Sequence, residues 1–246
     1  SELLSVQAFG RFSRTTPTYI EWELNAMYLT QPLHRNLQIN PEQLMTICAE
    51  RRFTVRQHVE RVSRLAGALR QLGVDSGDRV AMLSLNSDRY MEYLNAVPWA
   101  DAVLNPCNSR WSVKENAYAL NDSGTVVLLV DDHFKNMGQS LREQVPCLRQ
   151  LIYTGDEETP EGMLNYEMLL AEAEPVEDAR RCGEALLGIF YTGGTTGFPK
   201  GVMISHNAYC SSQLAALGVF NPGGTMLRSA PMFHMADLAL GYVGIL

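Results

Sequence analysis

Apolar residues recur at helical spacing from Thr54 onward. Between Val55 and Leu69, valines, alanines and leucines follow one another in steps of three or four residues, which places them on one face of an amphipathic helix. Thr54 and Gln57 have the types and spacing of a capping box, and Gly73 is placed to end the helix. The pattern therefore predicts one long helix between these two signals.

Runs of apolar, often β-branched residues alternate with helical segments through the middle of the chain. Expected strands cover residues 79–85, 102–104, 125–130, 150–153 and 185–191, and expected helices cover residues 88–100, 112–120, 133–145 and 166–173, with a turn at 121–124. The run at 125–130 is typical of a strand buried on both faces. The alternation predicts an α/β fold, a mostly parallel sheet with helices on both faces.

The two ends of the chain are less regular. Residues 1–52 lack a clean period and carry three interrupting prolines, so we expect an irregular segment that wraps over another part of the protein. Near the other end we expect a helix from Ser205 to about Leu217, a turn and a strand over 225–230. We therefore divide the chain into a wrapping segment (1–52), an α/β subdomain (53–205) and the start of a second α/β subdomain, truncated (206–246).

Composition excludes several classes of protein. A net charge of −7 over 246 residues argues against a nucleic-acid binder. The five cysteines form no Cys-x-x-Cys pair, which predicts reduced thiols in a cytoplasmic protein and no zinc site. No apolar run approaches the ~18 residues of a membrane span, and no signal peptide is recognisable.

The candidate chemistry lies between Tyr191 and Gly201, in the stretch Tyr-Thr-Gly-Gly-Thr-Thr-Gly-Phe-Pro-Lys-Gly. Glycines let backbone N–H groups approach an anion, the threonine hydroxyls are neutral donors, and Lys200 supplies a positive charge. No acidic residue occurs from residue 185 to residue 236, although the chain has 27, which suits a bound polyanion. These features predict a phosphate site; the alternative is a glycine-rich turn between two strands with an incidental lysine.

This stretch has neither the Walker A spacing nor the dinucleotide-binding spacing. It closely resembles the signature loop of the AMP-forming acyl-CoA synthetases and their adenylate-forming relatives, whose usual form is Tyr-Thr-Ser-Gly-Thr-Thr-Gly-x-Pro-Lys-Gly. The departure is Gly193 in place of Ser, which removes one hydroxyl. Four further stretches look like the N-terminal subdomain of that family: residues 52–54, 72–81, 105–110 and 121–124.

The resemblance implies roles for particular residues. The residues that would cradle the β- and γ-phosphates of ATP are Thr192, Gly193, Gly194, Thr195, Thr196, Gly197 and Lys200. The sequence Pro-Met-Phe-His ending at His234 resembles the second core motif of the family, which implies a catalytic role for His234 in orienting the acyl carboxylate. From the residue alone, a histidine in a loop is as readily explained by local hydrogen bonding. His206, directly after the motif, is interpreted as a polar residue in the first turn of a helix.

The family activates a carboxylic acid with ATP and Mg²⁺, giving acyl-AMP, and then transfers the acyl group to CoA. The resemblance therefore implies an AMP-forming acid–CoA ligase, with a fatty acid as the expected substrate. Two alternatives stay open: an amino-acid or aryl-acid adenylation domain, and a nucleotide-binding or interaction module without turnover. The sequence does not define which acid is used.

The family also supplies a Mg²⁺-binding Glu, a ribose-binding Asp and a C-terminal Lys that have no counterpart in these 246 residues. We therefore expect an incomplete part of such an enzyme that is inactive alone. Residues 238–246 are almost wholly apolar, so we also expect the isolated chain to self-associate or to need the remainder for solubility.

Overall fold

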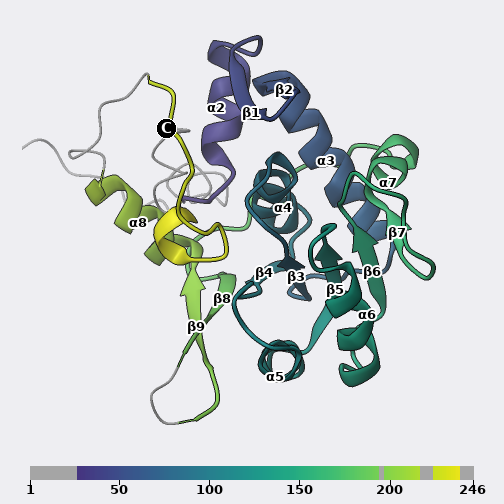
Figure 1. Ribbon diagram of the computed structural model, residues 1–246. Helices are drawn as coiled ribbons and strands as arrows, with labels where there is room; N and C mark the ends of the chain where they lie inside the picture. Colours follow the sequence, from purple (N-terminus) through teal and green to yellow (C-terminus); the bar gives the residue numbers. More distant parts are fainter. Residues whose placement is uncertain (1–26, 194–196, 217–223, 239–246) are drawn as a thin grey trace, which may run out of the picture.

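A seven-stranded sheet forms the centre of the structure, a computed structural model that describes residues 27–193, 197–216 and 224–238 (Figure 1). The helices are α2 (Gln31–Ile39), α3 (Val55–Gln71), α4 (Asp88–Trp99), α5 (Val113–Ser123), α6 (Lys135–Gln144), α7 (Tyr166–Glu172) and α8 (His206–Ala216). The strands are β1 (Leu44–Cys48), β2 (Arg51–Thr54), β3 (Arg79–Leu83), β4 (Val103–Pro106), β5 (Thr125–Val130), β6 (Gln150–Tyr153), β7 (Leu164–Asn165), β8 (Leu186–Thr192) and β9 (Lys200–Ser205).

The strand order in the large sheet is β7-β6-β5-β3-β4-β8-β9. Every neighbouring pair is parallel except the last, because β9 returns antiparallel to β8. Helices α3 and α4 lie on one side of this sheet, and α5 and α6 lie on the other (Figure 1). The predicted α/β fold, a mostly parallel sheet with helices on both faces, is confirmed.

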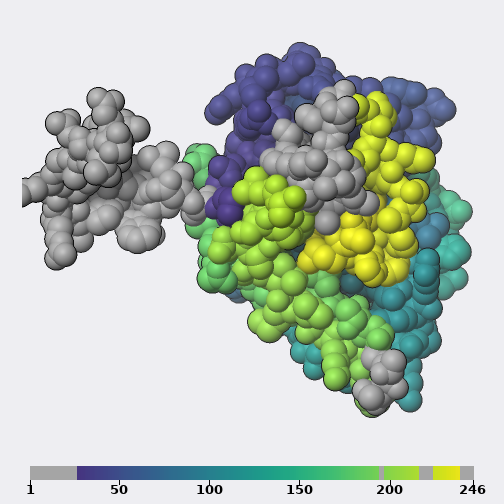
Figure 2. All heavy atoms as spheres, turned by 90° about the vertical axis from the view of Figure 1, so that its left-hand side faces the viewer, coloured from purple at the N-terminus to yellow at the C-terminus, as the bar shows by residue number. Residues whose placement is uncertain are grey.

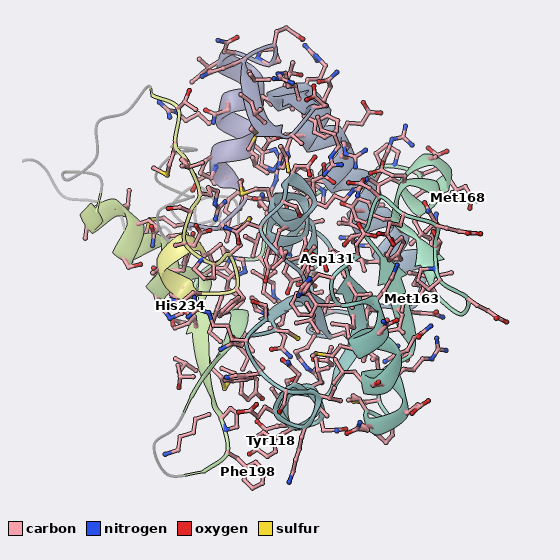
Figure 3. The ribbon with its side chains drawn as sticks, viewed as in Figure 1. Tyr118, Asp131, Met163, Met168, Phe198 and His234 are labelled. Carbon is pink, nitrogen blue, oxygen red and sulfur yellow. The ribbon has the colours of Figure 1, made fainter. Side chains whose placement is uncertain are left out.

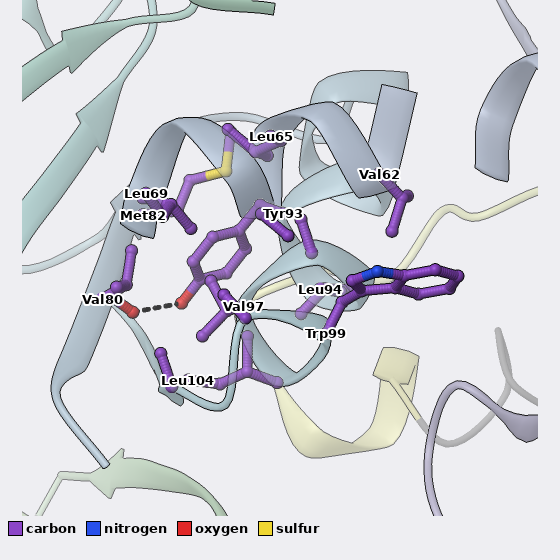
Figure 4. Close-up of a cluster of buried hydrophobic side chains, with 14 of the residues drawn as sticks. Val62, Leu65, Leu69, Val80, Met82, Tyr93, Leu94, Val97, Trp99 and Leu104 are labelled. Carbon is purple, nitrogen blue, oxygen red and sulfur yellow. Dashed lines mark hydrogen bonds between the residues drawn. The ribbon is translucent and has the colours of Figure 1, made fainter. Parts of the chain in front are cut away.

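Side chains of the central strands alternate between two hydrophobic cores. Along β3, Val80 and Met82 join the core beneath α3 and α4, whereas Ala81 and Leu83 join the core beneath α5 and α6. Tyr93 of α4 crosses the first core and donates its hydroxyl hydrogen to the carbonyl of Val80 at 2.9 Å (Figure 4). All six residues of β5 are buried, as its sequence predicts.

The capping signals predicted the helix starts correctly, but one turn was misplaced. Thr54 and Gln57 form the reciprocal capping box of α3. The turn expected at 121–124 is wrong, because α5 continues to Ser123 and ends at Gly124, which has a φ of +63°. The amide of Asn121 donates back to the carbonyl of Ala117 at 2.9 Å, so its side chain forms a hydrogen bond within the helix and not in a turn.

Two further expectations from the ends of the chain are wrong. The described residues between 27 and 52 are not irregular: they form α2 and the β1–β2 hairpin, and Pro32 lies in the first turn of α2, where proline is tolerated. Residues 225–230 form no strand. The Asn86 amide donates to the carbonyls of Arg228 and Ala230 at 3.1 and 2.7 Å, so this backbone is held by a side chain and not by a strand.

Helix α4 is buried along its whole length, including its charged residues. Arg51 of β2 donates to both oxygens of Asp88, at 2.7 and 2.9 Å. Arg61 of α3 donates to both oxygens of Glu92, at 2.6 and 3.1 Å. Arg89 donates to Asp156, which lies beyond β6, at 2.8 Å. Each buried charge of α4 therefore has an opposite charge within hydrogen-bond reach, as low-dielectric burial requires.

The Asp88 pair makes stability depend on pH. Burial alone would raise the pKa of Asp88, but the hydrogen bonds and charge of Arg51 lower this pKa overall. A carboxyl group whose pKa is lower in the folded state contributes stability above its unfolded pKa, near 4. That contribution is lost as the pH falls through the folded pKa.

We predict that Arg51→Gln lowers the free energy of unfolding at pH 7 by about 1.5–3 kcal/mol, the contribution of hydrogen bonds to a charged group. The variant also loses less of its remaining stability below pH 4 than the parent, because Asp88 no longer has a lowered pKa. Urea unfolding between pH 3 and pH 7 measures both effects. Arg56→Gln is the control, since Arg56 and its partner Glu42 are 58% and 69% exposed; equal effects of the two substitutions would contradict the prediction.

Candidate functional site

The predicted phosphate loop connects the antiparallel strands β8 and β9. The last recorded pair of this hairpin joins Thr192 to Lys200, and the loop leaves the carboxyl end of β8, which runs parallel to β4. Ligands of parallel α/β sheets bind at this edge. Three of the predicted binding residues, Gly194, Thr195 and Thr196, lie outside the described residues.

The remaining predicted loop residues are available to a ligand. Thr192, Gly193, Gly197 and Lys200 are all exposed. Gly197 has a φ of +132°, a backbone conformation that residues other than glycine rarely adopt. Within the part of the chain that the structure describes, Lys200 forms no ion pair, whereas Lys135 pairs with Glu157. The Lys200 ammonium group is therefore available to an anion.

Helix α5 contacts this hairpin at the end of β8 and within the loop. The hydroxyl of Tyr191 donates to the carboxylate of Asp122 at 2.6 Å. The ring of Phe198 stacks on the ring of Tyr118, with centroids 4.6 Å apart and planes 22° from parallel (Figure 3). Burial, and then the bond to Asp122, raise the pKa of Tyr191 above its usual range, so its hydroxyl stays protonated and donates. Residues 185–236 contain no acidic residue, but in the folded structure a carboxylate, that of Asp122 on α5, lies beside Tyr191.

Gly201 permits the Tyr191 contact. A Cβ atom at residue 201 would lie 2.7 Å from a methyl carbon of Ile189 and 3.0 Å from the ring of Tyr191. The Tyr191 ring therefore lies across the space that a side chain at residue 201 would fill. Sequence reasoning did not assign a role to Gly201, although its place at the end of the motif, opposite Tyr191 in a hairpin, was the available signal.

His234 lies elsewhere in the structure. It is exposed, its backbone N–H donates to the carbonyl of Pro231 at 3.0 Å, and its Nδ1 accepts from the N–H of Ala236 at 3.3 Å. Figure 3 places His234 beside α8 and well away from Phe198 at the loop end of the hairpin. The structure therefore does not bring His234 together with the described loop residues, and its local hydrogen bonds match the simpler interpretation of the residue.

The segment that carries His234 is anchored at the carboxyl end of β3. The side-chain Oδ1 of Asn86, which follows β3, accepts the backbone N–H of Met232 at 2.9 Å. This segment packs beside α8 on the face shown in Figure 2. Both candidate motifs thus lie at the carboxyl ends of strands: the loop leaves β8, and the segment that carries His234 is held at the end of β3. They lie at separate places along that edge of the sheet.

His206 belongs to the packing of the molecule. It begins α8, as expected, but it is only 2% exposed. Its Nδ1 accepts the backbone N–H of Leu29 at 3.4 Å. Burial lowers the pKa of His206 to about 4, so the ring is neutral at pH 7. This histidine joins α8 to the segment before α2.

The described ranges contain neither a metal cluster nor a membrane helix. No group of three or more His, Cys, Asp or Glu side chains in them is arranged to hold a metal ion. Likewise, no helix among these residues is both long enough and apolar enough to cross a bilayer.

Comparison with known proteins gives consistent matches. The family model described as AMP-binding enzyme matches residues 33–246. A long-chain-fatty-acid–CoA ligase of Thermus thermophilus is 40% identical over 200 residues, which cover 79% of this chain and 36% of that protein. The chain therefore spans little more than a third of this curated relative.

Solved structures agree with the sequence matches. The anthranilate CoA ligase AuaEII, in complex with anthranoyl-AMP, has a TM-score of 0.73 and 27% identity, covering 77% of this chain and 36% of its own. The N-terminal domain of FACL13 from Mycobacterium tuberculosis has a TM-score of 0.77 and 25% identity, covering 89% of this chain and 54% of its own.

We predict that Gly201→Ala destabilises the hairpin, because the added methyl group overlaps Ile189 and Tyr191. Overpacking of this kind typically costs about 1–3 kcal/mol of unfolding free energy, measurable by urea unfolding. Gly193→Ala in the same loop is the matched control, since a Cβ there meets nothing within 4 Å. Equal stability of the two variants would show that the close approach at Gly201 carries no constraint.

Proposed function

This chain belongs to the AMP-binding enzyme family, and we propose that it forms the ATP-binding N-terminal part of an AMP-forming acid–CoA ligase. The observation that carries the proposal is the exposure of Thr192, Gly193, Gly197 and Lys200 at the carboxyl end of β8, where Lys200 forms no ion pair with any residue that the structure describes. The chain spans 36% of the Thermus ligase, so the complete reaction is proposed for the longer protein and not for these residues alone.

The reaction consists of two displacements. A carboxylate oxygen of the acid bonds to the α-phosphorus of ATP, and the bond to the β-phosphate breaks, so that pyrophosphate leaves with the electron pair and acyl-AMP remains. The CoA thiolate then attacks the acyl carbonyl and expels AMP. Mg²⁺, when bound, would partly neutralise the charge of the phosphates.

In this proposal the loop acts on the leaving pyrophosphate. Backbone N–H groups and hydroxyls of the loop residues surround its β- and γ-phosphates, and Lys200 places a positive charge beside them. Fixed donors directed at developing charge supply most of the stabilisation in phosphoryl-type transfer. The residues proposed for this role are Thr192, Gly193, Gly194, Thr195, Thr196, Gly197 and Lys200.

For the acid, we propose a fatty acid. The support is the 40% identity to the long-chain-fatty-acid–CoA ligase. The anthranilate ligase structure supports an aryl acid as the second candidate. A cytoplasmic location is also proposed, and the five cysteines, which include no Cys-x-x-Cys pair, support it.

ATP–pyrophosphate exchange by the longer protein tests the function. Fatty, aryl and amino acids are supplied in turn, with labelled pyrophosphate. Exchange that depends on fatty acids supports the proposal, and exchange that depends on aryl or amino acids assigns the alternative substrate. Binding of ATP without exchange for any acid identifies a nucleotide-binding module and overturns the enzymatic proposal.

For Lys200→Ala we predict a loss of roughly 10- to 150-fold in kcat/KM of the exchange reaction. A hydrogen bond to a charged group contributes about 1.5–3 kcal/mol, and each 1.36 kcal/mol corresponds to a factor of ten. Lys135→Ala is the control, because Lys135 lies on α6 and pairs with Glu157, which follows β6. Unchanged exchange in the Lys200 variant would remove this residue from the site.

His234→Ala tests the second motif separately. If His234 orients the acid, the KM for the acid rises by roughly tenfold, about the contribution of one hydrogen bond in the site, while the KM for ATP is unchanged. Steady-state exchange with each substrate varied in turn measures both constants. An unchanged KM for the acid would leave His234 with only its local backbone contacts.

A further inference from the structure

The sheet alone does not hold the distal end of the β8–β9 hairpin. Strand β8 pairs with β4 at Gly188, opposite Leu104, and beyond this residue its described pairing is with β9. Strand β9 lies at the edge of the sheet, and its Met203 is 68% exposed. Figure 1 shows the hairpin extending away from the other strands. The loop at its end needs support from another element.

Helix α5 provides that support at two points one helical turn apart. Tyr118 and Asp122 are spaced i and i+4, so their side chains lie on the same face of α5. Asp122 accepts the hydroxyl of Tyr191, which precedes the loop, and Tyr118 stacks on Phe198, which lies within it. The two contacts therefore hold the chain on both sides of the segment between Tyr191 and Phe198.

The end of α5 is itself tightly held. The Arg79 guanidinium donates to the carbonyl oxygen of Ser123 and, at 2.8 Å, to that of Gly124. The Asn105 amide donates to the hydroxyls of Ser123 and Thr125, both at 2.8 Å. These bonds join the last turn of α5 to β3, β4 and β5. A contact with α5 is thus a contact with the rigid centre of the sheet.

We propose that Tyr118 and Asp122 are positioning residues that place the phosphate loop for its ligand. They act through Phe198 and Tyr191 and touch no reacting atom. The physical effect is preorganisation: a loop whose two ends are already placed loses less conformational entropy when it binds. This inference rests on the proposed function for the identity of the ligand, but the two contacts themselves do not.

The test compares Tyr191→Phe and Tyr118→Leu in the longer protein. Tyr191→Phe removes only the hydroxyl and retains the ring that packs over Gly201. It therefore keeps the inference testable if Tyr118→Leu fails to fold. Met168→Ala on α7 is the control, because Met168 and Phe198 are both 61% exposed and Figure 3 places Met168 far from the hairpin. Asp122→Ala, alone and combined with Tyr191→Phe, tests whether these two residues act together.

Hydrogen exchange of the hairpin amides without nucleotide is the first measurement. One hydrogen bond or one aromatic pair of this kind corresponds to a factor of about 2–12, so exchange accelerates by that factor in each variant and not in the control. The double variant of Tyr191 and Asp122 accelerates no more than either single variant. Unchanged exchange in the hairpin, or fully additive effects, would overturn the inference.

The second measurement is the KM for ATP in pyrophosphate exchange. The apparent affinity scales with the fraction of molecules whose loop is correctly placed, so the KM for ATP rises by up to the same factor while kcat changes less. A fall in kcat with unchanged KM would indicate a merely structural role and would overturn the inference. If the parent protein catalyses no exchange with any acid, the proposed function fails, and hydrogen exchange alone decides whether α5 positions the hairpin.

Discussion

The burial of α4 imposes the strongest constraint on this structure. Its charged residues Asp88, Arg89 and Glu92 are at most 6% exposed, and an unpaired charge in such a place costs several kcal/mol. Arg51 and Arg61 supply two of the required partners from β2 and α3. The N-terminal hairpin and α3 are therefore held against α4 by the need to pair its charges, and not only by apolar contact.

The same helix organises the carboxyl edge of the sheet. The residue before its N-cap, Asn86, binds the backbone around Ala230 and Met232. The segment that carries His234 is thus attached where β3 passes into α4. Its Arg228 donates to the carboxylate of Asp237 at 2.9 Å, which closes the segment on itself. The position of this second motif follows from the packing of α4.

The proposed phosphate loop depends on a different support. Its hairpin leaves the sheet beyond Gly188, and α5 supplies the contacts that β4 no longer provides. The acidic Asp122 comes close to a loop that is otherwise free of acids, but its carboxylate is engaged by the hydroxyl of Tyr191. This hydrogen bond ties Asp122 on α5 to the residue next to the end of β8.

Local patterns in the sequence predicted the central parallel strands and the capped starts of α3 and α5. Capping boxes and strand runs involve residues that are close in the sequence, so they can be recognised without knowledge of the fold. Only the tertiary structure decided that Gly201 must lack a side chain, that Asn121 belongs to a helix, that residues 225–230 form no strand, and that Asp122 meets Tyr191. Residues 225–230 and Asp122 are placed by contacts between residues far apart in the chain, such as Asn86 with Ala230, and those contacts exist only after the chain has folded. Gly201 meets Tyr191 only once the β8–β9 hairpin has formed.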